Sequence, residues 1–386
     1  MLYFVLQWLE TSFSPPGLQV VEFITVRATL AAITTFIIAM VIGPRVIDWL
    51  KRKQLGEEVR TGLNANLVDH SHKNGTPTMG GLIIISAIVI STLLWGDLRE
   101  IYVWLIVIAI LWMGAFGFVD DYVKTVRKDK AGLAPRMKIT GQAGLGLLIG
   151  SVMYFHPQFA DTRAMTELPF LRDWHFDYNV LGNLFLEGAD LGWILFIPMS
   201  VLVITATSNA VNLTDGLDGL AAGVTAIVAL GLVALCYVAG HAGFSSYLGV
   251  THLSGAGELT VFASAMVTAC LGFLWFNSYP ATVFMGDTGS LALGAAIAVL
   301  ALMVKKELLL PLLCAVFFME TVSVIMQTTY FRYTRRKTGK GQRIFLMAPL
   351  HHHYEGQGVH EAKIVTRFWL VTVVTVLATV LSLRIR

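Results

Sequence analysis

Two acidic motifs in this chain have the residue types of a metal and phosphate site. Asp120 and Asp121 are neighbours at the end of an apolar run, and Asn212, Asp215 and Asp218 recur every third residue in a segment with two glycines. Carboxylates at the carboxyl end of a helix oppose its dipole, so we interpret Asp120 and Asp121 as functional groups and not as caps. Adjacent helical side chains point about 100° apart, so one can face a metal while the other faces a second group.

A third motif, FMGDTGS, places Asp287 among small residues, with Asn277 and Phe284 shortly before it. Backbone N–H groups at the start of a helix suit an anionic phosphate. The segment lacks the Gly-Lys-Ser/Thr of a P-loop, which excludes that kind of nucleotide site. Phe284 is either an interfacial aromatic residue or a platform on which a nucleobase stacks.

Three lysines add positive charge near these acids. Lys73 lies in a loop rich in Gly and Pro, and Lys124 and Lys138 follow the Asp pair, so all three are candidate phosphate contacts. Hard carboxylate oxygens beside lysines and Gly-rich loops indicate Mg²⁺ or Mn²⁺ acting on a phosphorylated substrate. These residues by themselves name neither a sugar nor a lipid.

A run of three histidines, His351, His352 and His353, lies near the end of the chain. Three consecutive histidines do not easily ligate one ion, and no cysteine nearby supports a zinc site. We therefore expect them to bind phosphate or transfer a proton at the site and not to serve folding, the alternative being a polar loop at the membrane surface.

The elements that position these motifs are predicted to be membrane helices. Of the 386 residues, 55% are hydrophobic and 14% are charged, with a mean hydropathy of +0.68. This composition excludes a disordered chain, a nucleic-acid-binding domain and an ordinary cytosolic enzyme. We predict an all-α integral membrane protein with one polytopic domain over residues 1–386. Its ten spans are 21–44, 79–95, 101–118, 139–155, 192–211, 217–239, 258–276, 289–304, 308–331 and 364–383.

Positive charge predicts the orientation of these spans. Most of the 28 Lys and Arg residues fall in the loops after the first, third and ninth spans, which places these loops in the cytoplasm and both termini outside. The acidic, glycine-rich and histidine motifs then all lie at the cytoplasmic face. We expect Met1–Glu10 to be an interfacial segment and the acid-rich outer loop 157–191 to be a solvated surface loop.

Glu320 lies near the middle of the ninth predicted span, where an acid is a functional candidate. No second charge joins it there, so we interpret it as a hydrogen-bonding group between helices. A secondary transporter is disfavoured, because it would gather ionisable residues at the midplane and here they gather at one face. Cys236, Cys270 and Cys314 lie in apolar runs and predict helix packing, with no disulfide framework.

The motifs FVDD, NLTDGLDG, FMGDTGS and PLHHHYE resemble, in this order, those of the polyprenyl-phosphate N-acetylhexosamine-1-phosphate transferase superfamily over nearly the whole chain. GTPTMGG and HHHYE resemble one member of it, the phospho-N-acetylmuramoyl-pentapeptide-transferase family. This resemblance implies a Mg²⁺-dependent transferase of the bacterial inner (plasma) membrane, with UDP-MurNAc-pentapeptide and undecaprenyl phosphate as substrates and UMP and lipid I as products. It also implies contact with membrane lipids, a homodimer and no nucleic acid. The alternative is transfer of GlcNAc-1-phosphate to the same carrier, by an enzyme that should lack HHHYE.

The resemblance also assigns roles to the acids. Asp287 would ligate Mg²⁺, while Asp120 and Asp121 would hold the metal and phosphate. Asp120 is the favoured base or nucleophile. Direct attack by the acceptor phosphate and a covalent intermediate on an Asp both remain open.

The remaining motifs would surround these acids. By the same resemblance, Lys73, Asn277 and Phe284 would form the nucleotide pocket, with Phe284 stacked on uracil. Asn212 and Asp215 would form another polar wall, and the histidine run would complete the site.

Overall fold

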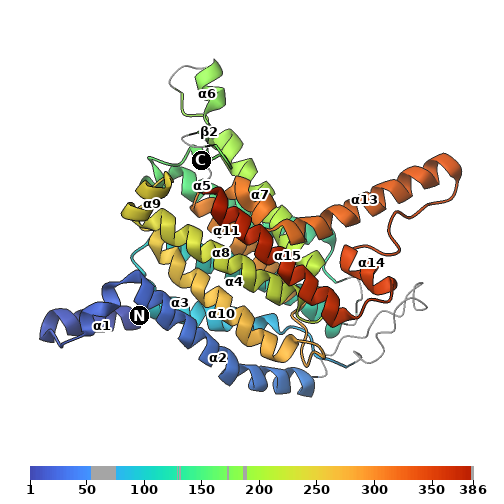
Figure 1. Cartoon of the computed structure of the whole chain (residues 1–386), viewed down its shortest axis with the longest axis horizontal. Helices are drawn as coiled ribbons and strands as arrows, with labels where there is room; N and C mark the ends of the chain where they lie inside the picture. The colour runs from blue at the N-terminus through green and yellow to red at the C-terminus, as the bar shows by residue number, and fades with distance from the viewer. Residues whose placement is uncertain (54–74, 128, 130–131, 172–173, 186–188, 384–386) are drawn as a thin grey trace.

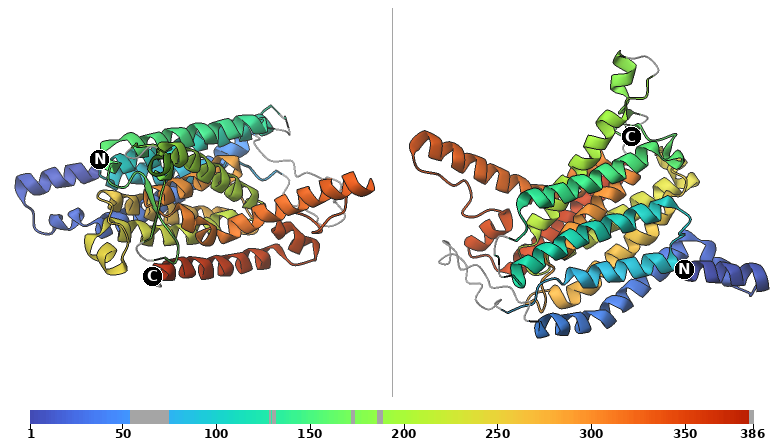
Figure 2. Two further views of the ribbon diagram at one scale, coloured as in Figure 1. Left: turned by 90° about the horizontal axis from the view of Figure 1, so that it is seen from above. Right: turned by 180° about the vertical axis from the view of Figure 1, so that it is seen from behind.

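The computed structural model describes residues 1–53, 75–127, 129, 132–171, 174–185 and 189–383, and the statements below concern these residues. Lys73 lies outside them. As predicted, the chain is mainly helical, and its long helices lie side by side in one bundle (Figure 1). The start of α2 and the end of α15 lie toward one end of the bundle, and α14 lies toward the other (Figures 1 and 2).

The long helices occupy the predicted spans. They are α2 (Ile24–Arg52), α3 (Gly81–Trp95), α4 (Ile101–Thr125), α5 (Pro135–Phe155), α7 (Trp193–Thr214), α8 (Leu220–Gly240), α10 (Leu259–Asn277), α11 (Gly286–Met303), α13 (Ala315–Thr338) and α15 (Glu361–Ser382). The shorter elements are α1 (Leu2–Phe13), η1 (Leu18–Glu22), η3 (Pro157–Phe159), β1 (Met165–Glu167), β2 (His175–Asp177), α6 (Val180–Phe185), α9 (Ala242–Leu248), η4 (Ala256–Glu258), η5 (Glu307–Leu309), α12 (Leu310–Leu313) and α14 (Leu350–Gly356).

Seven helices of the described chain are long and apolar enough to cross a membrane: α2, α4, α7, α8, α10 (with η4), α11 and α15. The apolar helix α3 is shorter, with 15 residues. The predicted span 308–331 is not one straight helix, because η5–α12 and α13 meet at Cys314 with a bend of 82°. Cys314 leaves the helical conformation at φ −102° and ψ 27°, and α13 projects away from the bundle (Figure 1).

Helix α11 forms the centre of the bundle. Every side chain from Thr288 to Met303 is buried, and α3, α4, α7 and α8 all pack against this helix. A helix that is apolar on all sides is stable only when neighbours surround it. The start of α11, which carries Asp287, is therefore held by several helices at once.

The acid-rich segment 157–191, predicted to be a solvated surface loop, is one only in part. It contains an antiparallel hairpin of β1 and β2, and Glu167 at the end of β1 is buried. The Glu167 carboxylate pairs with Lys306, and the Tyr178 hydroxyl donates to Glu307 Oε1 at 2.9 Å. Lys305 and Lys306 are both buried after α11, and burial lowers the pKa of Lys305 to about 8. Such buried charges need partners, and this segment supplies Glu167 for Lys306 and Tyr178 for Glu307.

Candidate active site

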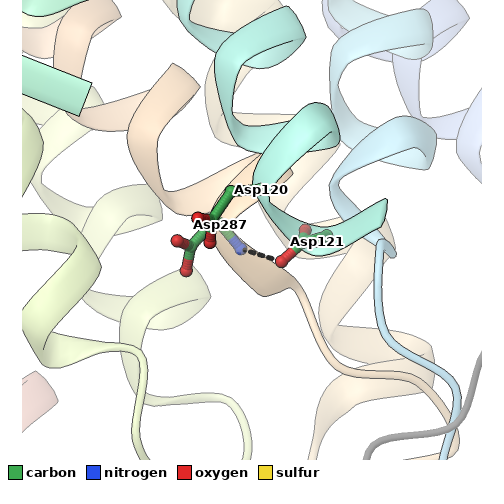
Figure 3. A group of neighbouring side chains, drawn as sticks. All are labelled: Asp120, Asp121 and Asp287. Atoms are coloured by element: carbon green, nitrogen blue, oxygen red, sulfur yellow. Dashed lines mark hydrogen bonds between the residues drawn. The ribbon is translucent and has the colours of Figure 1, made fainter. Parts of the chain in front are cut away.

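Asp120, Asp121 and Asp287 form one group in the structure (Figure 3). One carboxylate oxygen from each lies within 4.8 Å of the others. Asp120 and Asp121 lie in the last turns of α4, and Asp287 lies in the first turn of α11. Because α4 and α11 pack against each other, residues more than 160 positions apart in the sequence come together.

Asp121 has a role that the sequence interpretation excluded. Its Oδ1 accepts the Asp287 N–H at 3.1 Å, and its Oδ2 accepts the N–H and the hydroxyl of Thr288 at 2.9 and 2.6 Å. These backbone donors belong to the first turn of α11, so Asp121 caps a neighbouring helix. The interpretation that neither Asp is a cap was wrong for Asp121, because it considered only the dipole of the helix that carries the pair.

Asp120 and Asp287 share two lysines. Asp120 Oδ2 lies 2.5 Å from Lys124 Nζ and 3.0 Å from Lys138 Nζ. Asp287 Oδ2 lies 3.1 Å from Lys124 Nζ and pairs with Lys138. Asn212 Nδ2 donates to the other Asp287 oxygen at 2.9 Å. The ammonium groups offset the repulsion between the two carboxylates, and both predicted lysines thus lie at the acidic group.

Glycines allow this close approach of α4 and α11. A Cβ on Gly117 would lie 2.2 Å from the backbone oxygen of Asp287. Gly286 has a φ of +73°, and a Cβ on it would lie 2.5 Å from Asp121 Oδ2. Only glycine fits at both positions without moving the backbone that carries Asp287.

The GTPTMGG segment pairs with the chain before α11 through backbone hydrogen bonds. The Phe284 N–H donates to Pro77 O at 2.8 Å, and the Gly80 N–H donates to Phe284 O at 2.8 Å. The Gly81 N–H donates to Met285 O at 2.9 Å. The backbone of Phe284 is thus fixed on both sides, while its side chain is only half-buried.

Asp218 and Asn277 were predicted to bind substrate, but their described polar contacts join two loops. Asp218 Oδ2 accepts the Ala281 N–H at 3.0 Å, and Asn277 Oδ1 accepts the Gly219 N–H at 3.1 Å. Both residues are buried. Asp215 lies in the turn after α7 and is half-buried. These contacts hold the turn between α7 and α8 against the segment that leads to α11.

The histidine run supplies three of the seven residues of α14, and its members face different partners. His351 is fully buried, and a Cβ on Gly216 would lie 2.2 Å from its Nε2. His352 Nδ1 lies 2.9 Å from Glu355 Oε2, and His353 Nδ1 accepts a backbone N–H from residue 346. Burial lowers the pKa of His351 below the usual value. The ring of His351 contacts the NLTDGLDG segment at Gly216.

Two positioning residues were missed by the sequence interpretation. Glu361 begins α15 and accepts the Asp218 N–H at 2.6 Å, and Ser290 Oγ lies 2.9 Å from Asn212 Nδ2. The signal for Ser290 was its spacing of one helical turn from Asp287. Glu361 had a weaker signal, an acid at the start of an apolar helix.

The donor set fits a divalent cation. All three acidic side chains offer hard carboxylate oxygens, which suit Mg²⁺ or Mn²⁺ and not a soft metal. The three carboxylates outnumber the two ammonium groups beside them, so the cluster retains negative charge for a cation.

We expect Asp121→Ala to lower the free energy of unfolding by about 0.5–2 kcal/mol, the usual cost of losing a cap. Asp121→Asn keeps one acceptor oxygen for the first turn of α11, so its free energy of unfolding should fall by less. Thermal unfolding of both variants in detergent measures the difference. If Asp121→Ala unfolds at the wild-type temperature, Asp121 does not stabilise the start of α11.

Comparison with known proteins first defines the class. Residues 103–305, more than half of the chain, match the family described as glycosyl transferase family 4. This range runs from α4 to α11 and includes Asp120, Asp121 and Asp287. Residues 73–85 match signature 1 of phospho-N-acetylmuramoyl-pentapeptide-transferase.

Sequence identity to individual proteins then identifies the family within this class. The chain is 59% identical over 387 aligned positions to the phospho-N-acetylmuramoyl-pentapeptide-transferase of Salinibacter ruber, with 100% of both chains covered. It is 50% identical over 386 positions, again with full coverage, to the proteins of that name from Chloroherpeton thalassium and Chlorobium phaeobacteroides. The chain belongs to the phospho-N-acetylmuramoyl-pentapeptide-transferase family.

Proposed function

We propose that this protein transfers phospho-MurNAc-pentapeptide from UDP-MurNAc-pentapeptide to undecaprenyl phosphate in peptidoglycan synthesis, with UMP and lipid I as products. Membership of the family supports the reaction. One structural observation carries it: three carboxylates and two lysines from α4, α5 and α11 meet in one group. Such a group suits the binding of a metal-bound pyrophosphate.

Each residue of this group has a proposed task. Asp287 and Asp120 would hold Mg²⁺, which when bound would offset the negative charge on the transferred and leaving phosphates. Lys124 and Lys138 would bind phosphate oxygens, and Asn212 would orient Asp287 through their hydrogen bond. Asp120 would act as the base or the nucleophile. Asp121 would hold the start of α11 in place and stay within reach of the metal.

The membrane arrangement is part of the same proposal. We propose ten spans in the bacterial inner membrane, with both termini outside and the acidic group at the cytoplasmic face. The positions of the helices support the spans, and the start of α2 and the end of α15 lie toward the same end of the bundle (Figure 2). A homodimer and contact with membrane lipids rest on the family resemblance alone.

A reconstituted assay tests the reaction. The purified protein is incubated with UDP-MurNAc-pentapeptide, undecaprenyl phosphate and Mg²⁺, and UMP and lipid I are measured by mass spectrometry. A parallel reaction with UDP-GlcNAc tests the alternative donor. Formation of UMP from UDP-GlcNAc and not from the muramoyl donor would show that the proposed donor is wrong.

We expect Phe284→Ala to raise the KM for the nucleotide donor by a factor that corresponds to about 1–3 kcal/mol, as for other bases stacked on aromatic rings. The KM for undecaprenyl phosphate should change far less, because the ring would contact only uracil. Initial rates at varied concentrations of each substrate measure the two constants. Equal changes in both would mean that Phe284 is an interfacial residue.

A further inference from the structure

A buried carboxylate in α13 contacts the histidine segment. Glu320 is fully buried and lies shortly after the bend at Cys314. Its Oε1 accepts the backbone N–H of His351 at 3.2 Å, and its Oε2 lies 3.2 Å from His351 Nδ1. The predicted hydrogen bond between helices is confirmed, and it joins α13 to α14. A single carboxylate thus contacts both the backbone and the ring of His351.

The other side of the His351 ring faces the turn between α7 and α8. Its Nε2 and Cε1 would lie 2.2 and 2.9 Å from a Cβ on Gly216. Both ring nitrogens are buried, Nδ1 near Glu320 and Nε2 against Gly216, so the ring is packed between α13 and the turn. This geometry suits a packing role for the ring.

The turn of residues 215–219 is held at three further points, one of which is the hydrogen bond from the Ala281 N–H to Asp218 Oδ2. Its Asp218 N–H donates to Glu361 in α15, and its Gly219 N–H donates to Asn277 at the end of α10. The residues Asp120, Asp287 and the two lysines lie in α4, α5 and α11, and Asn212 in α7 contacts Asp287. Loosening α14 should therefore affect the 215–219 turn first, while the carboxylates and lysines of the cluster keep their contacts with one another.

We propose that Glu320 is a positioning residue that holds His351 against Gly216 and so fixes the 215–219 turn as one wall of the donor site. The proposal rests on the proposed function for the identity of the donor. In this proposal His351 acts through its contact with the turn, whereas the sequence predicted a catalytic role for it.

The first test uses the steric contact. Gly216→Ala should raise the donor KM about tenfold, because the new methyl group displaces the ring of His351. An effect of this size is usual for two residues in contact. In a His351→Ala background the methyl has room, so the same change should add little. Equal effects of Gly216→Ala in both backgrounds would overturn the proposal. So would His351→Ala lowering kcat with the donor KM unchanged, because the ring would then act in the chemistry.

The second test removes the carboxylate. Glu320→Ala should raise the donor KM about tenfold, again as a coupled neighbour, while the Mg²⁺ concentration for half-maximal rate stays at the wild-type value. Glu320→Gln keeps an acceptor oxygen and should recover most of the loss. Ser323→Ala is the matched control. The buried Ser323 hydroxyl, also in α13, donates only to the Glu320 backbone oxygen among its described contacts. Its loss should change neither the donor KM nor the Mg²⁺ concentration for half-maximal rate.

Hydrogen exchange provides a readout that needs no activity. Peptides covering residues 211–220 should exchange faster in Glu320→Ala than in the wild type or Ser323→Ala, measured by mass spectrometry in detergent. Unchanged exchange together with an unchanged donor KM overturns the positioning role. If the wild-type protein releases no UMP but the exchange rates change as expected, the proposed function fails while the contact stands.

Discussion

Asp287→Asn is expected to lower turnover about 10²–10³-fold, the scale for removing one electrostatic group from an active site. Asp287 contacts Lys124 and Lys138 through one oxygen and Asn212 through the other. Asparagine keeps the shape but removes the charge, so the variant should need more Mg²⁺ to saturate. Asp120→Asn should instead lower kcat at saturating metal, since its proposed task is chemical. Initial rates of UMP release during a metal titration measure both effects.

The acids are expected to act as a unit. The double variant of Asp120 and Asp287 should be hardly worse than the worse single variant. Asp97→Asn is a suitable control, because this carboxylate accepts hydrogen bonds from Arg99 in the turn between α3 and α4. It should keep the wild-type rate and metal dependence. An Asp287→Asn enzyme with the wild-type rate and Mg²⁺ midpoint would show that these acids share no metal site.

Gly117→Ala is expected to destabilise the protein and abolish most of its activity. The new Cβ would lie 2.2 Å from the Asp287 backbone oxygen and 2.7 Å from the Thr288 Cα. Backbone atoms cannot rotate away, so α4 and α11 must separate, at an overpacking cost of about 1–3 kcal/mol. A misplacement of about 1 Å at a reacting group can cost about 10²-fold in rate. Thermal unfolding and kcat of the purified variant measure the two losses.

Gly144→Ala is the matched control for this substitution. It is also a helical glycine, in α5, but a Cβ there would meet only the Trp112 ring at 3.4 Å, an ordinary contact distance. Alanine favours a helix over glycine by about 1 kcal/mol, so this variant should be at least as stable as the wild type and fully active. If Gly117→Ala behaves like Gly144→Ala, the close packing of α4 on α11 does not determine the position of Asp287.

The sequence by itself determined the helices and the chemistry of the site. Runs of apolar residues predicted a helix at every described span, because a chain in lipid must satisfy its backbone hydrogen bonds within each segment. The residue types of the acidic motifs, with Lys124 and Lys138, indicated a metal and phosphate site. The order of the motifs indicated the family. The helices, the residue types of the site and the motif order can all be read from residues that are close together in the sequence.

Only the tertiary structure decided what these residues contact. Asp121 caps α11, which no pattern within α4 reveals, and Glu320 contacts His351 across the bend at Cys314. The burial of Glu167 likewise depends on Lys306, which is 139 positions away. The physical reason is that helix formation is local, whereas the partner of a buried polar group depends on which helices pack together. A buried charged group needs a hydrogen-bonding or oppositely charged partner. The packing of the helices determines which residue is close enough to be that partner.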